Sequence, residues 1–372
     1  YDDDTERFTA FQIAVVDWLS HWEHRPDAVH VHDHHTGLIP FMMRNCFDYR
    51  HLAEVPTILT IHNAQYQGWM SWDKSNYIPS WDSWQGGLLE WNNTINPLAC
   101  AVKCADRVTT VSPSYMEELT QQANGLEQLF RMERAKSSGI LNGIDTVVWN
   151  PENDTYILDN FSVKDAATGK KLNKKKLCKD FKLDETLPLF VYIGRLVGEK
   201  AADLLPQAIT DSISQLGKRM NFLILGSGDK RVEDHLTYLT EGFAGFYNSR
   251  IGYNEKLSHQ MYAGADFLLM PSRVEPCGLN QMYALRYGTI PIVRSTGGLK
   301  DTVIDFGEPG GFGIRFNHAS VWDITYSIHR AVELYDDKEK MTELIKQIMQ
   351  IDNSWEKSAE KYIDLYQSIQ LK

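Results

Sequence analysis

Two neighbouring loops in the second half of the chain contain residue types that can bind hydroxyl groups and phosphates. Glu275 lies in the segment Pro-Ser-Arg-Val-Glu-Pro-Cys-Gly-Leu, residues 271–279, and its carboxylate can accept hydrogen bonds from hydroxyl groups. Gly297 and Gly298 lie in the next loop, and we expect their backbone N–H groups to be unoccupied at a helix N-terminus. A lone Glu-Pro pair indicates only a turn, but the two loops together suit a nucleotide sugar.

Two further loops of the same half carry cations and glycines. Arg195 and Lys200 lie in the segment Gly-Arg-Leu-Val-Gly-Glu-Lys, between an expected strand and an expected helix. Two cations near a helix N-terminus can bind a diphosphate. Residues 226–228, Gly-Ser-Gly, form a second glycine-rich strand end. Taken alone, each segment also fits an ordinary solvated loop or a glycine turn.

Histidines follow two expected strands in the first half of the chain. His30, His32 and Asp33 raise the alternative of a metal site, because these residue types are common metal ligands. Their order is unusual for such a site and the sequence offers no second cluster, so a polar strand end that lines a cleft is the simpler interpretation. His62 follows the next strand beside Asn63 and several aromatic residues, which suits contacts with the hydroxyl groups and ring faces of sugars.

Short runs of Val, Ile, Leu and Thr alternate with helical patterns in both halves, which predicts two doubly wound, Rossmann-like α/β domains with parallel sheets. We expect a first domain over residues 1–150, a second over 151–350, and a C-terminal helix over 351–372 that packs back on the first. The loops at the carboxyl ends of parallel strands bind ligands, so we expect the site in the cleft between the two domains. The expected strands are 28–32, 56–62, 107–112, 138–143, 189–193, 222–225, 266–270 and 290–293, and the expected helices are 36–47, 202–215, 255–263 and 279–287.

The segment 151–187 differs from the rest because it is polar and contains a lysine cluster over residues 169–176. A solvated linker and helix face is the simpler interpretation of such a charge run, and a basic binding patch is the alternative.

Composition excludes several classes of function. The chain has 38 Lys and Arg against 49 Asp and Glu, a net charge of −11, which argues against nucleic-acid or anionic-membrane partners. No stretch approaches the ~18 consecutive apolar residues of a membrane span. The five cysteines are few, odd in number and scattered, which indicates a reducing compartment such as the cytoplasm. The chain begins Tyr-Asp-Asp-Asp, without an initiator Met or signal peptide, so we expect further residues to precede it.

These motifs together resemble the bacterial glycogen synthases and plant starch synthases of glycosyltransferase family 5. The Glu-Pro-Cys-Gly-Leu segment followed by Thr-Gly-Gly-Leu is specific for that family among retaining transferases. The resemblance implies the two-domain GT-B fold and transfer of glucose from ADP-glucose, or from UDP-glucose, to the non-reducing end of an α-1,4-glucan, with retention of configuration and without a metal or other cofactor. The matching segments, in family order over nearly the whole chain, are 30–33, 60–63, 66–68, 111–115, 141–145, 149–151, 194–196 with Lys200, 251–253, 271–279 and 295–299.

The resemblance also implies roles for individual residues on the donor side. Arg195 and Lys200 would neutralise the departing diphosphate, and Thr296, Gly297 and Gly298 would hold it through backbone donors. Preorganised cations and N–H groups lower the barrier of such a reaction because negative charge develops on the leaving phosphate.

The nucleoside and the sugar would be held by other loops. By the same resemblance, Tyr253 would stack on the adenine, Gly194 would line the donor site, and Glu275 would bind glucose hydroxyls. The backbone of Cys277, Gly278 and Leu279 would assist Glu275.

From the first half of the chain, Asn142 and His62 would contact the glucose, and Asp33 would lie near the reacting centre on the acceptor side.

The sequence departs from the family pattern at three places. The Lys-x-Gly-Gly-Leu loop that follows the family's first strand is absent, which implies an incomplete first domain that lacks roughly 100 residues at ~30 residues per βαβ unit. His34 stands where the family often has Trp, and Ala201 stands where Gly usually follows Lys200. Two alternatives to an active synthase stay open. Because the loop is absent, the chain could be a non-catalytic fragment that binds glucan or nucleotide, and the histidines after the first strand leave a metal-dependent hydrolase as the other alternative.

Overall fold

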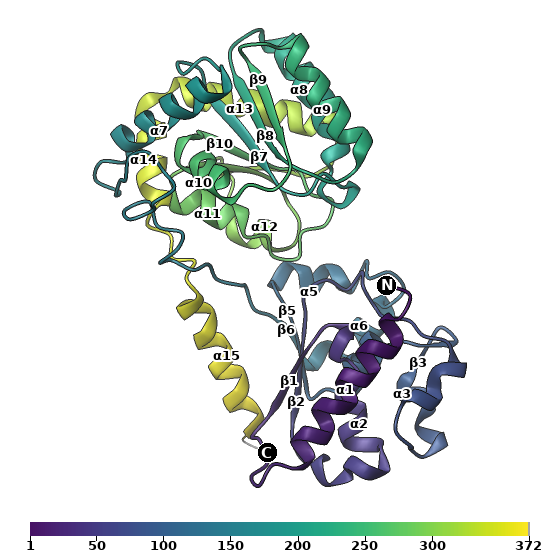
Figure 1. Ribbon diagram of the computed structural model, residues 1–372. Coiled ribbons are helices and arrows are strands. Elements are labelled where there is room, and N and C mark those ends of the chain that lie inside the picture. The colour runs from purple at the N-terminus through teal and green to yellow at the C-terminus, as the bar shows by residue number, and fades with distance from the viewer. Residues whose placement is uncertain (371–372) are drawn as a thin grey trace. The chain divides into compact units, whose positions relative to one another are not determined.

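The chain forms two compact units, and the computed structural model describes residues 1–370. The first unit consists of Tyr1–Leu141 together with the chain from Ser358 onward, and the second consists of Asn142–Lys357. Each unit is built on its own parallel sheet (Figure 1). Among the described residues, no helix combines the length and the apolar composition that a membrane span requires.

The first unit contains four parallel strands in the order β1-β2-β5-β6. Its second strand is buried at every position, as expected of a central strand in a parallel sheet. Helices α4 and α5 begin at side-chain caps, where Asn96 and Ser112 each accept a hydrogen bond from a first-turn N–H group and a proline follows. The elements are α1 (Asp4–Ser20), β1 (Val29–His32), α2 (Ile39–Asn45), β2 (Thr57–Ile61), α3 (Gly86–Leu89), β3 (Glu90–Trp91), β4 (Thr94–Ile95), α4 (Pro97–Cys104), β5 (Arg107–Thr110), α5 (Pro113–Leu119), α6 (Glu127–Met132) and β6 (Ser137–Gly139).

The C-terminal helix α15 (Trp355–Gln370) begins in the second unit and ends in the first. The Tyr366 hydroxyl lies 2.8 Å from Nδ1 of His30 on β1, and the Tyr362 ring lies 5.9 Å from the His30 ring. The helix therefore lies beside this sheet (Figure 1). The expected C-terminal helix ran to residue 372, and residues 371 and 372 lie outside the described part of the chain.

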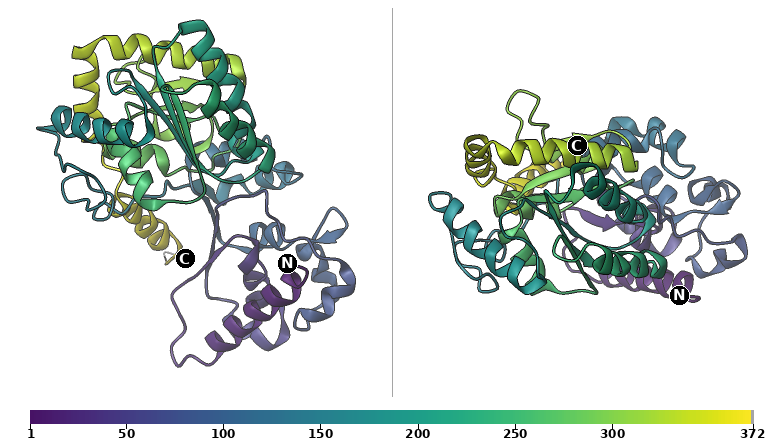
Figure 2. Two further views of the ribbon diagram at one scale, coloured as in Figure 1. Left: turned by 45° about the horizontal axis from the view of Figure 1, so that its top comes forward. Right: turned by 90° about the horizontal axis from the view of Figure 1, so that it is seen from above.

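The second unit contains six parallel strands in the order β12-β11-β10-β7-β8-β9. The Phe190 ring on β7 packs between the Phe222 and Phe267 rings of the neighbouring strands at 5.4 and 4.9 Å, in the core of the unit. Helices α8, α9 and α13 pack as one group and α7, α10, α11 and α14 as another, so that helices cover both faces of the sheet (Figure 2). The elements are α7 (Ala166–Phe181), β7 (Leu189–Ile193), α8 (Leu205–Leu216), β8 (Asn221–Gly226), α9 (Lys230–Gly242), β9 (Tyr247–Ile251), α10 (Glu255–Gly264), β10 (Phe267–Met270), α11 (Asn280–Arg286), β11 (Ile290–Arg294), α12 (Gly297–Thr302), β12 (Ile314–Phe316), α13 (Val321–Asp336) and α14 (Lys338–Ile348).

The prediction of two parallel α/β sheets is confirmed, but it misses two strands. β9 and β12 lie at the two edges of the second sheet. β9 carries Asn248, Ser249 and Arg250 in its middle, and β12 is only three residues long. Edge strands are partly solvated, so they lack the continuous apolar run that identifies a central parallel strand.

The prediction of a solvated lysine face on α7 is wrong for two of its lysines, because they are buried against α10. Lys170 Nζ donates to the carbonyl oxygens of Tyr262, Ala263 and Tyr287 at 3.4, 3.2 and 3.0 Å, at the C-terminal ends of α10 and α11. Lys174 Nζ lies 2.6 Å from the Asp266 carboxylate. The Asp266 carboxylate stabilises the positive charge of Lys174, whereas burial lowers the pKa of Lys170 to about 7.

Candidate active site

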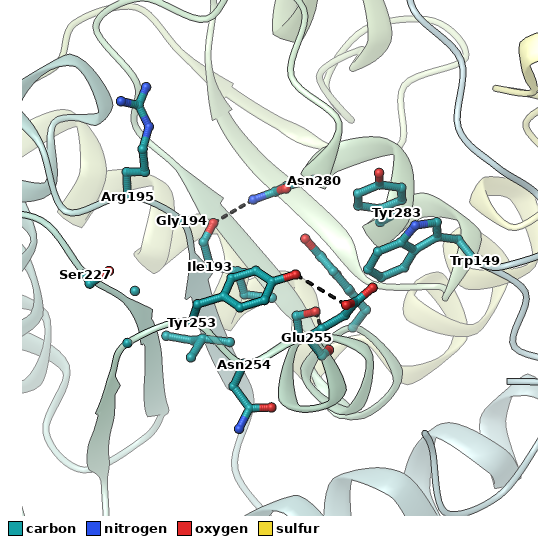
Figure 3. A pocket seen from close by; sticks show the side chains of 15 residues that line it. Trp149, Ile193, Gly194, Arg195, Ser227, Tyr253, Asn254, Glu255, Asn280 and Tyr283 are labelled. Carbon is teal, nitrogen blue, oxygen red and sulfur yellow. Dashed lines mark hydrogen bonds between the residues drawn. The ribbon is translucent and has the colours of Figure 1, made fainter. Parts of the chain in front are cut away.

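The loops that follow β7, β8, β9 and β10 meet at the carboxyl edge of the second sheet, because all of its strands are parallel. Two adjoining pockets lie there, one of about 300 Å³ and one of about 200 Å³. Both are lined by Ile193, Gly194, Arg195 and Asn280, and Asn280 Nδ2 donates to the Ile193 carbonyl at 2.6 Å (Figure 3). The hydrogen bond fixes the start of α11 to the end of β7.

The smaller pocket contains a buried ion pair. Lys200 Nζ lies 2.7 and 2.8 Å from the two carboxylate oxygens of Glu275, and Ser272 Oγ donates to Oε2 of the same carboxylate at 2.8 Å. The Glu275 side chain is 9% exposed and the Lys200 side chain 19%. Lys200 and Glu275 lie on separate loops in the sequence. In the structure they form an ion pair that places a hydrogen-bond acceptor and a cation at the wall of the pocket.

Arg195 is the more accessible cation of the site. Its side chain is 59% exposed, and its guanidinium lies 3.3 Å from the Glu199 carboxylate. The Tyr192 hydroxyl donates to the Arg195 carbonyl at 2.7 Å, which fixes the backbone of this loop. Burial and the nearby Glu275 charge raise the pKa of Tyr192, so its hydroxyl stays a donor. Arg195 can thus turn toward an anion in either pocket.

The paired glycines pack against the loop that carries Glu275. A Cβ atom on Gly297 would lie 2.0 Å from the Glu275 carbonyl oxygen, and one on Gly298 would lie 2.2 Å from the Cys277 carbonyl oxygen. The expectation that the Gly298 N–H group is unoccupied is wrong, because it donates to the carbonyl oxygens of Glu275 and Pro276, both at 3.1 Å. Thr296, the buried N-cap residue of α12, begins this segment. The glycines are needed for close backbone approach, and they position the Glu275 loop.

Residues 277–279 complete the smaller pocket. Gly278 and Leu279 line it, and Gly278 has a φ of +73°, a conformation that favours glycine. Cys277 is buried, and burial raises the pKa of its thiol to about 12 despite a hydrogen bond with the Asn142 backbone. The Cys277 thiol is therefore protonated at neutral pH and suits a packing role. Asn142, expected to act from the first half, is the first residue of the second unit.

The larger pocket is lined by several aromatic side chains, of which the sequence predicts only one. Tyr253, which was predicted, is 87% exposed, and its hydroxyl donates to Glu255 at 3.3 Å. Trp149 and Tyr283 line the pocket too, with ring centroids 3.9 Å apart and planes 19° apart. Arg195 and Trp149 lie at opposite ends of the pocket (Figure 3). Trp149 was noted only as part of a resemblance, and no local pattern linked it to a ring 134 residues later.

A buried network holds Trp149 in place. Its ring stacks on His259 at 3.8 Å, and His259 Nδ1 lies 2.7 Å from the Asp154 carboxylate. The Tyr287 hydroxyl donates to the same carboxylate at 2.6 Å. Burial raises the pKa of Asp154, but the hydrogen bonds from His259 and Tyr287 outweigh it and lower the pKa overall. A charged Asp154 thus anchors the aromatic end of the pocket.

In the first unit, the residues after β1 and β2 contact one another. The Asp33 carboxylate accepts a hydrogen bond from the His62 backbone N–H at 2.7 Å, and the His32 and His62 rings are linked at 3.0 Å. Asp33 has φ +56° and ψ −169°, a conformation that is costly for a residue with a Cβ atom. Strained backbone of this kind often marks a functional position. The structure therefore places Asp33 and His62 in one cluster.

The alternative metal site at His30 is not supported by its contacts. His30 Nδ1 lies 2.8 Å from the Tyr366 hydroxyl and Nε2 lies 2.7 Å from Thr60 Oγ1, so both ring nitrogens have protein partners. Burial, with the neighbouring His32 and His62, lowers the pKa of His30 to about 4. Within residues 1–370, three or more His, Cys, Asp or Glu side chains do not converge on a common metal position.

The chain is similar to known proteins over nearly its whole length. Residues 1–132 match the starch synthase catalytic domain, and residues 173–348 match glycosyl transferases group 1. A glycogen synthase of Flavobacterium johnsoniae is 55% identical over 369 residues, which cover 99% of this chain and 78% of that protein. A glycogen synthase of Streptococcus sanguinis is 37% identical over 379 residues, with 99% and 78% covered.

Solved structures give the same result. The catalytic domain of starch synthase IV from Arabidopsis thaliana, bound to ADP and acarbose, matches with a TM-score of 0.88 and 33% identity, covering 100% of this chain and 78% of that chain. A sucrose-phosphate synthase from Thermosynechococcus elongatus matches with a TM-score of 0.63 at 18% identity, covering 99% of this chain and 79% of that chain, which shows a shared fold alone.

Proposed function

Because the chain belongs to the glycogen synthase family of glycosyltransferases, we propose that it transfers glucose from ADP-glucose to the non-reducing end of an α-1,4-glucan with retention of configuration. The family membership makes the chain a glucosyltransferase with the GT-B fold. The bound ADP in the related starch synthase IV supports ADP, over UDP, as the nucleotide of the donor.

The observation that carries this proposal is the Lys200–Glu275 pair in the smaller pocket, beside the Arg195 that both pockets share. A glucosyl diphosphate needs a carboxylate for sugar hydroxyls and cations for phosphates within a few ångströms of each other. The smaller pocket, with Glu275, Gly278 and Leu279, would take the glucose, and the larger pocket, with Tyr253, would take the nucleoside. Arg195 lines both pockets and would bind the diphosphate between them.

The cations would act mainly on the departing ADP. As the bond between glucose and the diphosphate breaks, negative charge grows on the phosphate oxygens and positive charge grows on the sugar ring. Lys200 would leave part of its contact with Glu275 for the phosphate, and Glu275 would then accept from glucose hydroxyls. Charges already placed beside the phosphates cost little reorganisation during reaction, and one such contact lowers the barrier by ~3 kcal/mol.

We further propose that the first unit binds the acceptor and the second binds the donor. The linked Asp33 and His62, on the carboxyl ends of β1 and β2, support an acceptor site there. Asn142 would contact the donor glucose from the start of the second unit. The five cysteines, all among the described residues, are free thiols, and this supports a reducing location such as the cytoplasm.

The test is release of ADP by the full chain incubated with ADP-glucose and glycogen. We expect the Glu275→Gln variant to lower kcat/KM by ~10²-fold, because Gln cannot balance the Lys200 charge and has an acceptor on only one of its two terminal atoms. UDP-glucose in place of ADP-glucose should give a markedly lower rate.

A matched control is Glu241→Gln, which removes an exposed carboxylate on α9 and should leave the rate within twofold of the parent. Equal rates for Glu275→Gln and the parent would refute the role of Glu275. Binding of ADP without any release from ADP-glucose would instead identify a non-catalytic binding protein.

A further inference from the structure

A pair of exposed aromatic rings lies on α13, among residues that the proposed active site does not use. Trp322 is 71% exposed and Tyr326 is 54% exposed. They stand four residues apart and therefore on one face of the helix. Their ring centroids are 5.4 Å apart and their planes differ by only 7°. Single exposed aromatics are common, but these two rings are stacked, so each supports the other and the stack offers an apolar platform.

The platform forms one wall of a cavity of about 320 Å³ between α13 and α8. The remaining lining is polar, with Asp211 and Gln215 from α8 and Thr325 and His329 from α13, apart from Val321. This cavity has no lining residue in common with the two pockets at the carboxyl edge of the sheet. Its volume is in the range of small-ligand sites.

Among the described residues, two that line this cavity each carry a buried polar atom without a hydrogen-bond partner. Within the described residues, Thr325 Oγ1 and His329 Nε2 are buried and make no hydrogen bond. Thr325 is only 5% exposed as a residue. A buried polar atom without a partner costs free energy, so a ligand that offers hydroxyl groups would be favoured once these side chains turn toward it.

We propose that this cavity is a second carbohydrate-binding site, which holds a segment of an α-glucan chain away from the active site. The proposal rests on the proposed function, which gives the protein a glucan acceptor. A pyranose ring has an apolar C–H face that packs on an aromatic platform and a rim of hydroxyl groups that hydrogen-bond with side chains such as Asp211, Gln215, Thr325 and His329. The mixture of one acidic and several neutral groups suits an uncharged, hydroxyl-rich ligand.

Such a site has a consequence only for polymeric acceptors. A branched glucan can occupy the second site and the active site at the same time, and the first contact then raises the effective concentration of chain ends for the second. A trisaccharide is too short to occupy both. The site therefore lowers the KM for glycogen and leaves the KM for maltotriose unchanged.

The test compares glycogen and maltotriose as acceptors for the full chain and for the Trp322→Ala/Tyr326→Ala variant. We expect the KM for glycogen to be about threefold to tenfold higher for the variant, which corresponds to the binding free energy usually lost with an aromatic contact. Its kcat and its KM for maltotriose should stay within twofold of the parent. Tyr238→Ala, which removes a 69% exposed ring on α9, is the matched control and should change neither KM. An unchanged KM for glycogen, or equal losses on both acceptors, overturns the proposal.

A binding assay separates this site from the proposed function. Mobility of the protein in native gels that contain glycogen needs no turnover, so it reports on the site even if ADP-glucose is not a donor. Retardation that is reduced in the aromatic variant and in Thr325→Val supports the site. If the variants are retarded as much as the parent, the proposed site is overturned. It is also overturned if the parent forms a concentration-dependent dimer that the aromatic variant abolishes while glycogen binding persists.

Discussion

At the scale of single residues, the candidate site depends on how closely two loops approach each other. Glu275 faces Lys200 and Ser272 because its own backbone carbonyl accepts from Gly298 N–H. The paired glycines are thus linked to the chemistry through the Glu275 loop. A side chain at either glycine would collide with backbone atoms, which cannot move without the loop.

We therefore predict that Gly298→Ala disturbs both stability and donor binding. The new Cβ atom would lie 2.2 Å from the Cys277 carbonyl oxygen, so the Glu275 loop must shift. Urea unfolding should show a loss of about 2 kcal/mol or more, and the KM for ADP-glucose should rise at least tenfold. Gly242→Ala, at a position with open space around the added carbon, should change stability by less than about 1 kcal/mol. Equal effects at the two positions would contradict this explanation.

At the scale of elements, the contact between α15 and β1 depends on a neutral histidine. His30 is bonded to Tyr366 on one side and Thr60 on the other, an arrangement that suits one donating and one accepting ring nitrogen. Its pKa is lowered from 6.5 to about 4 in the folded protein. Between these values the unfolded chain binds a proton that the folded protein does not, so stability from His30 is present at pH 7 and is lost as the pH falls toward 4.

The corresponding prediction is that the effect of His30→Gln depends on pH. At pH 7 the free energy of unfolding of the variant should be about 1–2 kcal/mol lower than that of the parent, because the paired hydrogen bonds are lost. Near pH 4.5 the difference should shrink, because protonation in the unfolded chain already weakens the parent. His24→Gln, at an exposed position, is the control for general effects of losing a histidine. A difference that grows on acidification, measured by chemical unfolding, would contradict the assignment.

At the scale of the whole molecule, the two units differ in how the chain builds them. The second is one continuous segment, Asn142–Lys357, with its own hydrophobic core. The first needs two segments, because the chain from Ser358 onward returns to it. We predict that truncation after Lys357 lowers the unfolding temperature of the first unit by several degrees and leaves that of the second almost unchanged.

Scanning calorimetry would measure both transitions, and added ADP would identify the second unit because bound ligand raises its transition. In the untruncated chain, His30→Gln should also lower the unfolding temperature of the first unit, but by less than the truncation does. If truncation lowered both transitions equally, the assignment of the segment that begins at Ser358 to the first unit would be contradicted.

Local sequence was sufficient for the central parts of this fold. Continuous apolar runs predicted β7 and β10 almost to the residue, because a central parallel strand must be apolar on both faces. Glycines and a carboxylate after such strands also predicted which loops bear the proposed site. The edge strands β9 and β12 escaped prediction because their half-solvated positions carry polar residues or are too few to form a pattern.

Other features of the molecule depend on pairs of residues that are distant in the sequence. Lys170 belongs to a run that any local analysis assigns to solvent, yet it binds the ends of two helices 92 to 117 residues away. The Lys200–Glu275 pair, the Trp149–Tyr283 stack and the occupied Gly298 N–H group are likewise contacts between distant segments of the chain.

By itself, then, the sequence determined the α/β class, the strand ends that carry chemistry and the family, because those depend on periodicity and on the order of motifs. Only the tertiary structure decided which charges are neutralised, which backbone donors are already occupied and which aromatic rings share a pocket. The physical reason is that burial and hydrogen bonding are properties of neighbours in space, and these neighbours lie on different elements of the chain.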